Sequence, residues 1–138
     1  MAGLEDRRLT VFHFGIMSLS SPRWVLRPHP RLVRLLRKLA SRRPAESAAL
    51  LRNLDRYLNL LDQAPHVRLI QAGFLHPEPH GVVAVDERGG GPGLRALRLY
   101  TLADERTRIL HLLHLGDKSS QSRDLRLLPH LIRTRDLT

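Results

Sequence analysis

Apolar residues in the first half of the chain recur at the spacing of two consecutive amphipathic helices. Between Arg31 and Arg42, leucines lie three, four and seven positions apart, which places them on one side of a helix. Pro44 suits the first position of a second helix, and a matching leucine stripe extends that helix to Asp62. Because the link between the two is very short, the pattern predicts an antiparallel helical hairpin whose leucines face a sheet.

Strand patterns precede and follow this hairpin. The predicted strands are Leu9–Met17, Gly81–Arg88, Leu94–Leu102 and Arg108–Leu115, the last two joined by a turn at residues 103–107. Residues 18–30 are predicted to be a connection broken by three prolines, and residues 66–75 fit either a short helix or an extended lead into a strand. Ser122 can cap a last helix starting at Arg123, which Pro129 should end or kink. The order β-α-α-β-β-β-α predicts one α+β domain over residues 1–138.

Charge is the strongest feature of the composition. The formal net charge is +10, and nearly all the cations are arginine, which pairs with phosphate and stacks on bases. A small domain of this kind is expected to bind nucleic acid or an acidic protein, although a genome rich in G and C also raises the arginine content.

The absence of cysteine excludes disulfides, thiolate metal sites and cysteine nucleophiles. With no membrane-length apolar run and no secretory signal, the sequence predicts a cytoplasmic protein.

Cationic and imidazole side chains interrupt the strands of the second half. Alternation along the strands puts Arg98 and Tyr100 on the face that the helical hairpin does not cover, with His80 on the same side at the start of its strand. We expect this face to be open to solvent. Alternation also separates His111 from His114. The more apolar set contains His111, which favours His114 on the open face, but both stay candidates.

Together these groups suit cleavage of RNA by its own 2′-hydroxyl. That reaction needs a general base, a cation on the phosphate and a proton donor to the leaving oxygen. A histidine can be base or acid, Arg98 can stabilise the phosphorane, Tyr100 can orient or donate a proton, and Lys118 can hold a neighbouring phosphate. Arg95, at the start of its strand, is a further candidate contact. The alternative is a solvated basic face that binds nucleic acid without cleaving it.

The segment His76-Pro-Glu78-Pro-His80 has the spacing of metal ligands, but no second ligand cluster accompanies it, so we expect neither metal nor cofactor.

From Ser21 to Ile132, the order of elements and three motifs resemble the RelE/HigB-type toxins of bacterial toxin–antitoxin modules. The motifs are Asp86-Glu87-Arg88, Arg98-Leu99-Tyr100 and the KSSQS segment of residues 118–122, where many members have Lys-Lys-Thr-Gln. The resemblance implies a small curved antiparallel sheet with the helical hairpin on one face. It also implies cleavage of messenger RNA on the ribosome, and a small antitoxin protein as partner.

By the same resemblance, Arg88 and Arg98 match phosphate-binding arginines, Tyr100 matches an aromatic of the arginine strand, and Lys118 matches the basic exit. His111 or His114 matches the imidazole of some members. The proline-rich segment before the first helix departs from the family pattern. Because some proteins with this fold inhibit DNA gyrase and cleave no RNA, a non-catalytic module that binds nucleic acid or gyrase is the alternative.

Overall fold

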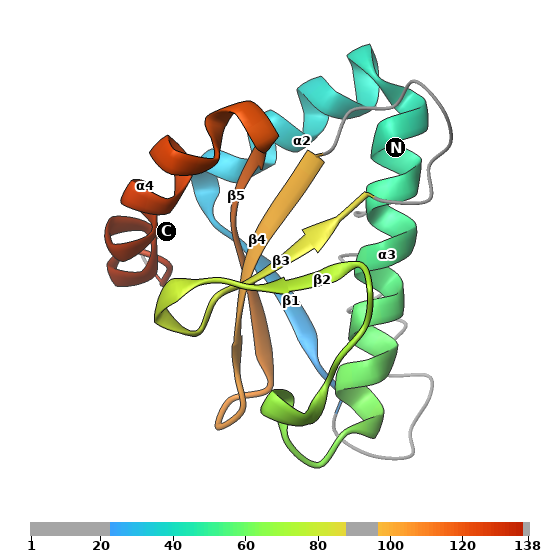
Figure 1. Cartoon of the computed structure of the whole chain (residues 1–138), viewed down its shortest axis with the longest axis vertical. Helices are drawn as coiled ribbons and strands as arrows, with labels where there is room; N and C mark the ends of the chain where they lie inside the picture. Colours follow the sequence, from blue (N-terminus) through green and yellow to red (C-terminus); the bar gives the residue numbers. More distant parts are fainter. Residues whose placement is uncertain (1–22, 88–96, 137–138) are drawn as a thin grey trace.

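The computed structural model describes residues 23–87 and 97–136, which contain three α-helices and a five-stranded mixed sheet (Figure 1). The strands and helices are β1 (Val25–Pro28), α2 (Pro30–Arg42), α3 (Pro44–Gln63), β2 (Leu75–Pro77), β3 (Val83–Asp86), β4 (Leu97–Asp104), β5 (Ile109–Asp117) and α4 (Gln121–Arg133). Three short 3-10 turns lie at Val67–Leu69, Pro79–Gly81 and Lys118–Ser120. The predicted α+β class is confirmed, and both helices of the predicted hairpin match to within one residue.

The strand order in the sheet is β1-β5-β4-β3-β2. Neighbouring strands from β5 to β2 are antiparallel, as the resemblance implies, whereas β1 is parallel to β5 and makes the sheet mixed. The prediction of an unstructured connection over residues 18–30 is therefore wrong at Val25–Pro28. Proline is tolerated in a strand at the sheet edge, so Pro28 ends β1 without preventing it. The predicted strand Leu9–Met17 lies outside the described residues.

The helical hairpin packs on one face of the sheet, as predicted. Leucines from both helices, including Leu32, Leu54 and Leu58, are fully buried against Val85 and Leu99. The N-terminus of α2 is capped by His29, whose ring Nδ1 accepts a hydrogen bond from the backbone N–H of Arg31. This cap fixes α2 beside the edge of β5 where β1 stops.

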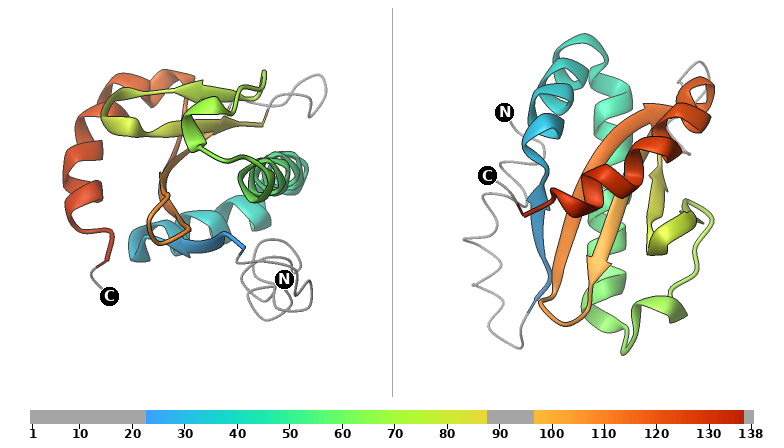
Figure 2. Two further views of the ribbon diagram at one scale, coloured as in Figure 1. Left: turned by 90° about the horizontal axis from the view of Figure 1, so that it is seen from below. Right: turned by 90° about the vertical axis from the view of Figure 1, so that its left-hand side faces the viewer.

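The opposite face is covered by α4, so the prediction of an open face is wrong (Figure 2). A second, smaller core forms there. Its fully or nearly fully buried members are Val82, Ala84, Tyr100, Leu113, Leu128 and Leu131. Of the two outcomes expected at Pro129, an end or a kink, the end does not occur, because α4 continues to Arg133. Burial of Leu128 and Leu131 on either side of Pro129 offsets the cost of about 3 kcal/mol for an interior helical proline.

A β-bulge changes which way the two histidines of β5 face. The β4–β5 register shifts between Tyr100 and Thr101, so that Tyr100 lies opposite His114 while Leu102 lies opposite His111. Residues two apart on a strand share a face, so both histidines lie on the α4 side of the sheet. The predicted separation of His111 from His114 onto opposite faces is therefore wrong. Strict alternation cannot anticipate an inserted residue.

Candidate functional site: a basic cleft between α2 and α4

Polar side chains form two rows across the α4 side of the sheet. The strand register aligns His76, Ala84, Tyr100 and His114 in one row across four strands. In the next row Arg98 lies between Asp86 on β3 and Gly116 on β5. The first turn of α4 adds Asp124 above Gly116. The two rows thus bring together the candidate residues Arg98 and Tyr100 from β4 and His114 from β5.

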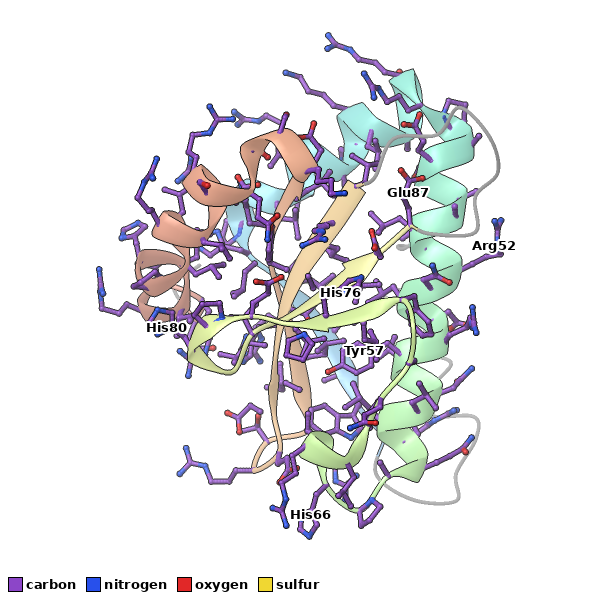
Figure 3. All side chains as sticks on the ribbon, viewed as in Figure 1. Arg52, Tyr57, His66, His76, His80 and Glu87 are labelled. Carbon is purple, nitrogen blue, oxygen red and sulfur yellow. The ribbon has the colours of Figure 1, made fainter. Side chains whose placement is uncertain are left out.

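Arg98 is engaged inside the protein. Its guanidinium Nη1 is 3.4 Å from the Glu78 carboxylate, and the side chains of Arg98 and Glu78 are only 14% and 9% exposed. The neighbouring Asp86 carboxylate is bonded by the ring Nε2 of His76 at 2.9 Å, with His76 reaching over from β2 (Figure 3). Arg98 therefore pairs with a buried carboxylate in this structure, whereas the sequence predicts an exposed contact with phosphate.

Tyr100 is fully buried beneath α4. Burial raises the pKa of its phenol to about 12, and its hydroxyl has no hydrogen-bond partner among the described residues. Its ring is stacked on that of His114, with the ring centroids 6.3 Å apart. Tyr100 thus supports His114 by packing, and its hydroxyl does not reach a surface where RNA could lie.

We expect Tyr100→Phe to leave the protein at least as stable as the wild type, and to leave any RNA cleavage unchanged. Removing a buried hydroxyl without a partner relieves a desolvation cost of about 1 kcal/mol. Urea unfolding at neutral pH measures the difference in free energy. A loss of stability in Tyr100→Phe would reveal a bound partner for the hydroxyl and contradict this description.

His114 is held by a buried carboxylate. Its ring Nε2 lies 2.9 Å from Asp124 Oδ1, and Asp124 is only 2% exposed. The other carboxylate oxygen accepts a hydrogen bond of 2.6 Å from the Ser120 hydroxyl. Because a carboxylate only accepts hydrogen bonds, the proton of neutral His114 sits on Nε2 and the lone pair on Nδ1. A carboxylate that orients an imidazole in this way is the usual support of a histidine base.

His114 also lines a cleft of about 400 Å³ between α2 and α4, on the edge of β5. The lining residues are Pro30, Arg31, Arg34, Leu35, Leu113, His114, Leu127 and Leu131. The walls are apolar, and the polar groups among these lining residues are two arginines and one imidazole. The cleft therefore offers an anion two guanidinium groups beside a histidine of fixed tautomer.

Positive charge accumulates around this cleft. Arg31 and Arg34 are exposed, and α2 has no acidic residue in its first turn. No ion pair joins either arginine to a carboxylate in residues 23–87 or 97–136. The pKa of His29 is lowered, first by burial and then by repulsion from Arg31, His130 and His114. Arg31 and two imidazoles thus surround His29 at the start of α2, and this concentration of basic groups favours binding of a polyanion.

The remaining predicted site residues lie elsewhere. His111 is buried near the C-terminal end of α4, where burial lowers its pKa, and it does not line the cleft. His80 is exposed at the turn between β2 and β3 (Figure 3). Lys118 is exposed in the 3-10 turn before α4. Arg88 and Arg95 lie outside the described residues.

The sequence analysis missed Asp124, Arg31 and Arg34. All three lie in predicted helices and belong to none of the motifs named above. A usable signal existed for Asp124, because an acidic residue in the first turn after a strand can reach back to a histidine on that strand. No comparable signal pairs Arg31 with His114, since their proximity depends on the packing of α2 against β5.

The segment at residues 76–80, whose spacing resembles that of metal ligands, forms contacts within the protein. His76 forms a hydrogen bond with Asp86, and Glu78 pairs with Arg98. No group of three or more His, Cys, Asp or Glu side chains in the described part of the chain could hold a metal ion. In that same part, none of the helices combines the length and apolar character needed to cross a bilayer.

Comparison with protein-family models, curated proteins and solved structures finds no match for this chain. A function must therefore be inferred from the cleft and its chemistry.

Proposed function

We propose that this chain is an endoribonuclease of the toxin type that cleaves messenger RNA without a metal ion. In this proposal the α2–α4 cleft binds the RNA backbone and His114 transfers the proton. The observation that carries it is the Asp124–His114 pair at the wall of a cleft whose other polar lining groups are Arg31 and Arg34. An oriented imidazole beside two phosphate-binding cations suits attack of a 2′-hydroxyl on the adjacent phosphodiester.

The proposed reaction uses groups of this chain only. Nδ1 of His114 takes the proton from the 2′-hydroxyl as the 2′ oxygen forms its bond to phosphorus. Arg31 and Arg34 stabilise the negative phosphorane. The bond from phosphorus to the 5′ oxygen then breaks. In the proposal that oxygen takes a proton from His130, which does not line the cleft but is exposed on α4 directly before Leu131, a lining residue. The products are a 2′,3′-cyclic phosphate and a 5′-hydroxyl end.

Two further parts of the proposal rest on the resemblance to RelE/HigB-type toxins. The first is that the message is cleaved while it is bound to the ribosome. The second is a small antitoxin partner that blocks the site. Charge complementarity supports this partner, because an acidic segment can occupy the same cationic cleft as RNA.

The proposal is tested by expressing the chain in bacteria and mapping the 5′ ends of messenger RNA, with His114→Ala beside the wild type. We expect new ends within translated frames for the wild type and none for a folded His114→Ala variant. Ends that persist unchanged in the variant would overturn the assignment of the cleft.

The second candidate is a module that binds nucleic acid or gyrase without cleaving RNA. The burial of Tyr100 and the internal pairing of Arg98 favour it, because they leave fewer groups for catalysis. Growth arrest with intact transcripts in the same experiment is the result that distinguishes this candidate.

If RNA binds at the cleft, removing the cleft arginines should reduce the salt dependence of RNA affinity by a defined amount. Each phosphate contact to a single strand contributes about 0.7 to the slope of log affinity against log salt, so Arg31→Ala with Arg34→Ala should lower the slope by about 1.4. The matched control is Arg52→Ala with Arg68→Ala, which removes the same charge from exposed positions outside the cleft. Fluorescence anisotropy with labelled single-stranded RNA measures both slopes. Equal losses in the two variants would mean that only total charge matters.

A further inference from the structure

Position 116 requires glycine because there is no room for a Cβ, and not because of its backbone conformation. It does not have the positive φ that favours glycine, which among the described glycines occurs at Gly81. A Cβ at position 116 would lie 1.9 Å from Asp124 Oδ2, 2.7 Å from Asp124 Cγ and 2.9 Å from Ser120 Oγ. The Asp124 carboxylate therefore occupies the place that any other side chain on β5 would fill at this position.

Ser120 fixes the same carboxylate from the other side. Its hydroxyl donates to Asp124 Oδ2 at 2.6 Å and accepts the backbone N–H of Asp117 at 3.0 Å. The backbone N–H of Ser120 in turn donates to the Asp117 carboxylate at 3.0 Å. This reciprocal capping box holds the hydroxyl in one direction. With Oδ2 of Asp124 engaged, Oδ1 is directed at Nε2 of His114.

We infer that Gly116 and Ser120 are positioning residues, which together hold the Asp124 carboxylate in hydrogen-bond contact with Nε2 of His114. With Nε2 bonded in this way, Nδ1 of the imidazole is directed to the cleft. The inference rests on the proposed function for its effect on catalysis, whereas its effect on the tautomer of His114 is independent of any activity. Neither residue is among those that line the cleft, so we infer that both act through Asp124.

An alanine at position 116 is compatible with the strand backbone and must displace the carboxylate instead. Asp124 sits in the first turn of α4, and the carboxylate that must give way to the new Cβ is the one whose Oδ1 bonds Nε2 of His114. For histidines that bind a metal, loss of the hydrogen-bond partner that orients the ring typically costs about 10- to 100-fold, and we take the same range for this oriented imidazole. We expect a loss of this size for Gly116→Ala and a similar loss for Asp124→Asn.

The test is the tautomer of His114, read from the ¹⁵N shifts of its imidazole in uniformly labelled full-length protein. We expect protonated Nε2 in the wild type and a mixture of tautomers in Gly116→Ala. The matched control is Gly73→Ala, because a Cβ at Gly73 meets nothing within 4 Å. This control should keep both the wild-type tautomer and the wild-type cleavage rate.

Ser120→Ala serves as a second variant if Gly116→Ala does not fold, and Ser120→Thr should restore the tautomer because it retains the hydroxyl. An unchanged tautomer in folded Gly116→Ala or in Ser120→Ala would overturn the inference. If the tautomer shifts as expected while the wild type cleaves no RNA, the positioning role stands and the proposed function fails. If the wild type cleaves RNA and the tautomer of His114 is the same in all variants, the proposed function stands and the positioning role fails.

Discussion

Replacing His114 with alanine is expected to slow RNA cleavage by about 10²- to 10⁴-fold, the usual contribution of a positioned general base. His114 is the imidazole that lines the cleft, and the Asp124 carboxylate holds it in one tautomer. Affinity for RNA should change little, because the phosphate contacts of Arg31 and Arg34 remain. Single-turnover cleavage of a translated message with purified ribosomes measures the rate.

The control for this prediction is His80→Ala. His80 is an exposed histidine outside the cleft, so its removal makes the same chemical change without touching the proposed base. Its cleavage rate should equal that of the wild type. Equal rates for His114→Ala and the wild type would exclude His114 as the base.

Arg98→Ala is expected to destabilise the protein by about 3–5 kcal/mol, the usual cost of removing one partner from a buried ion pair. The guanidinium pairs with Glu78, and Asp86 lies opposite Arg98 in the β3–β4 register. The side chains of both acids are less than one-tenth exposed. Without Arg98 the buried Glu78 carboxylate loses its cationic partner and stays poorly hydrated. Urea unfolding monitored by circular dichroism measures the loss.

The control for charge alone is Arg52→Ala, since Arg52 points away from α3 into solvent (Figure 3). A surface change of this kind should shift stability by less than about 0.5 kcal/mol. The double variant Arg98→Met with Glu78→Gln should recover part of the loss, because it removes an uncompensated charge. If Arg98→Ala proves as stable as the wild type, the buried ion pair is not structural. Because Arg98→Ala is expected to destabilise the fold, relief of growth arrest by this variant would not by itself identify Arg98 as a catalytic residue.

The helical hairpin was predictable because its signal is local. Leucine spacing and Pro44 specify α2 and α3, and their leucines face the sheet as expected. The strand β1 was not predictable in the same way. Four residues beside prolines carry almost no pattern of their own, and β1 exists because the edge of β5 is there to pair with it.

The site was only partly predictable. Alternation correctly grouped Arg98 with Tyr100, but whether that face is open depends on where α4 packs. Pro129 suggested an early helix end, while burial of Leu128 and Leu131 extends α4 over the face. The bulge next to Thr101 then returns His111 to the side of His114. Both effects come from tertiary packing, which no local pattern of residues encodes.

The position of RNA on the protein decides whether the α2–α4 cleft is its binding site. Single-stranded RNA carrying 4-thiouridine is cross-linked to the full chain with ultraviolet light, and the modified peptides are identified by mass spectrometry. We predict cross-links in the first half of α2 and the second half of α4, around Arg34 and Leu127, which line opposite walls of the cleft. Cross-links confined to the outer side of α3 or to the β4–β5 turn would contradict the account.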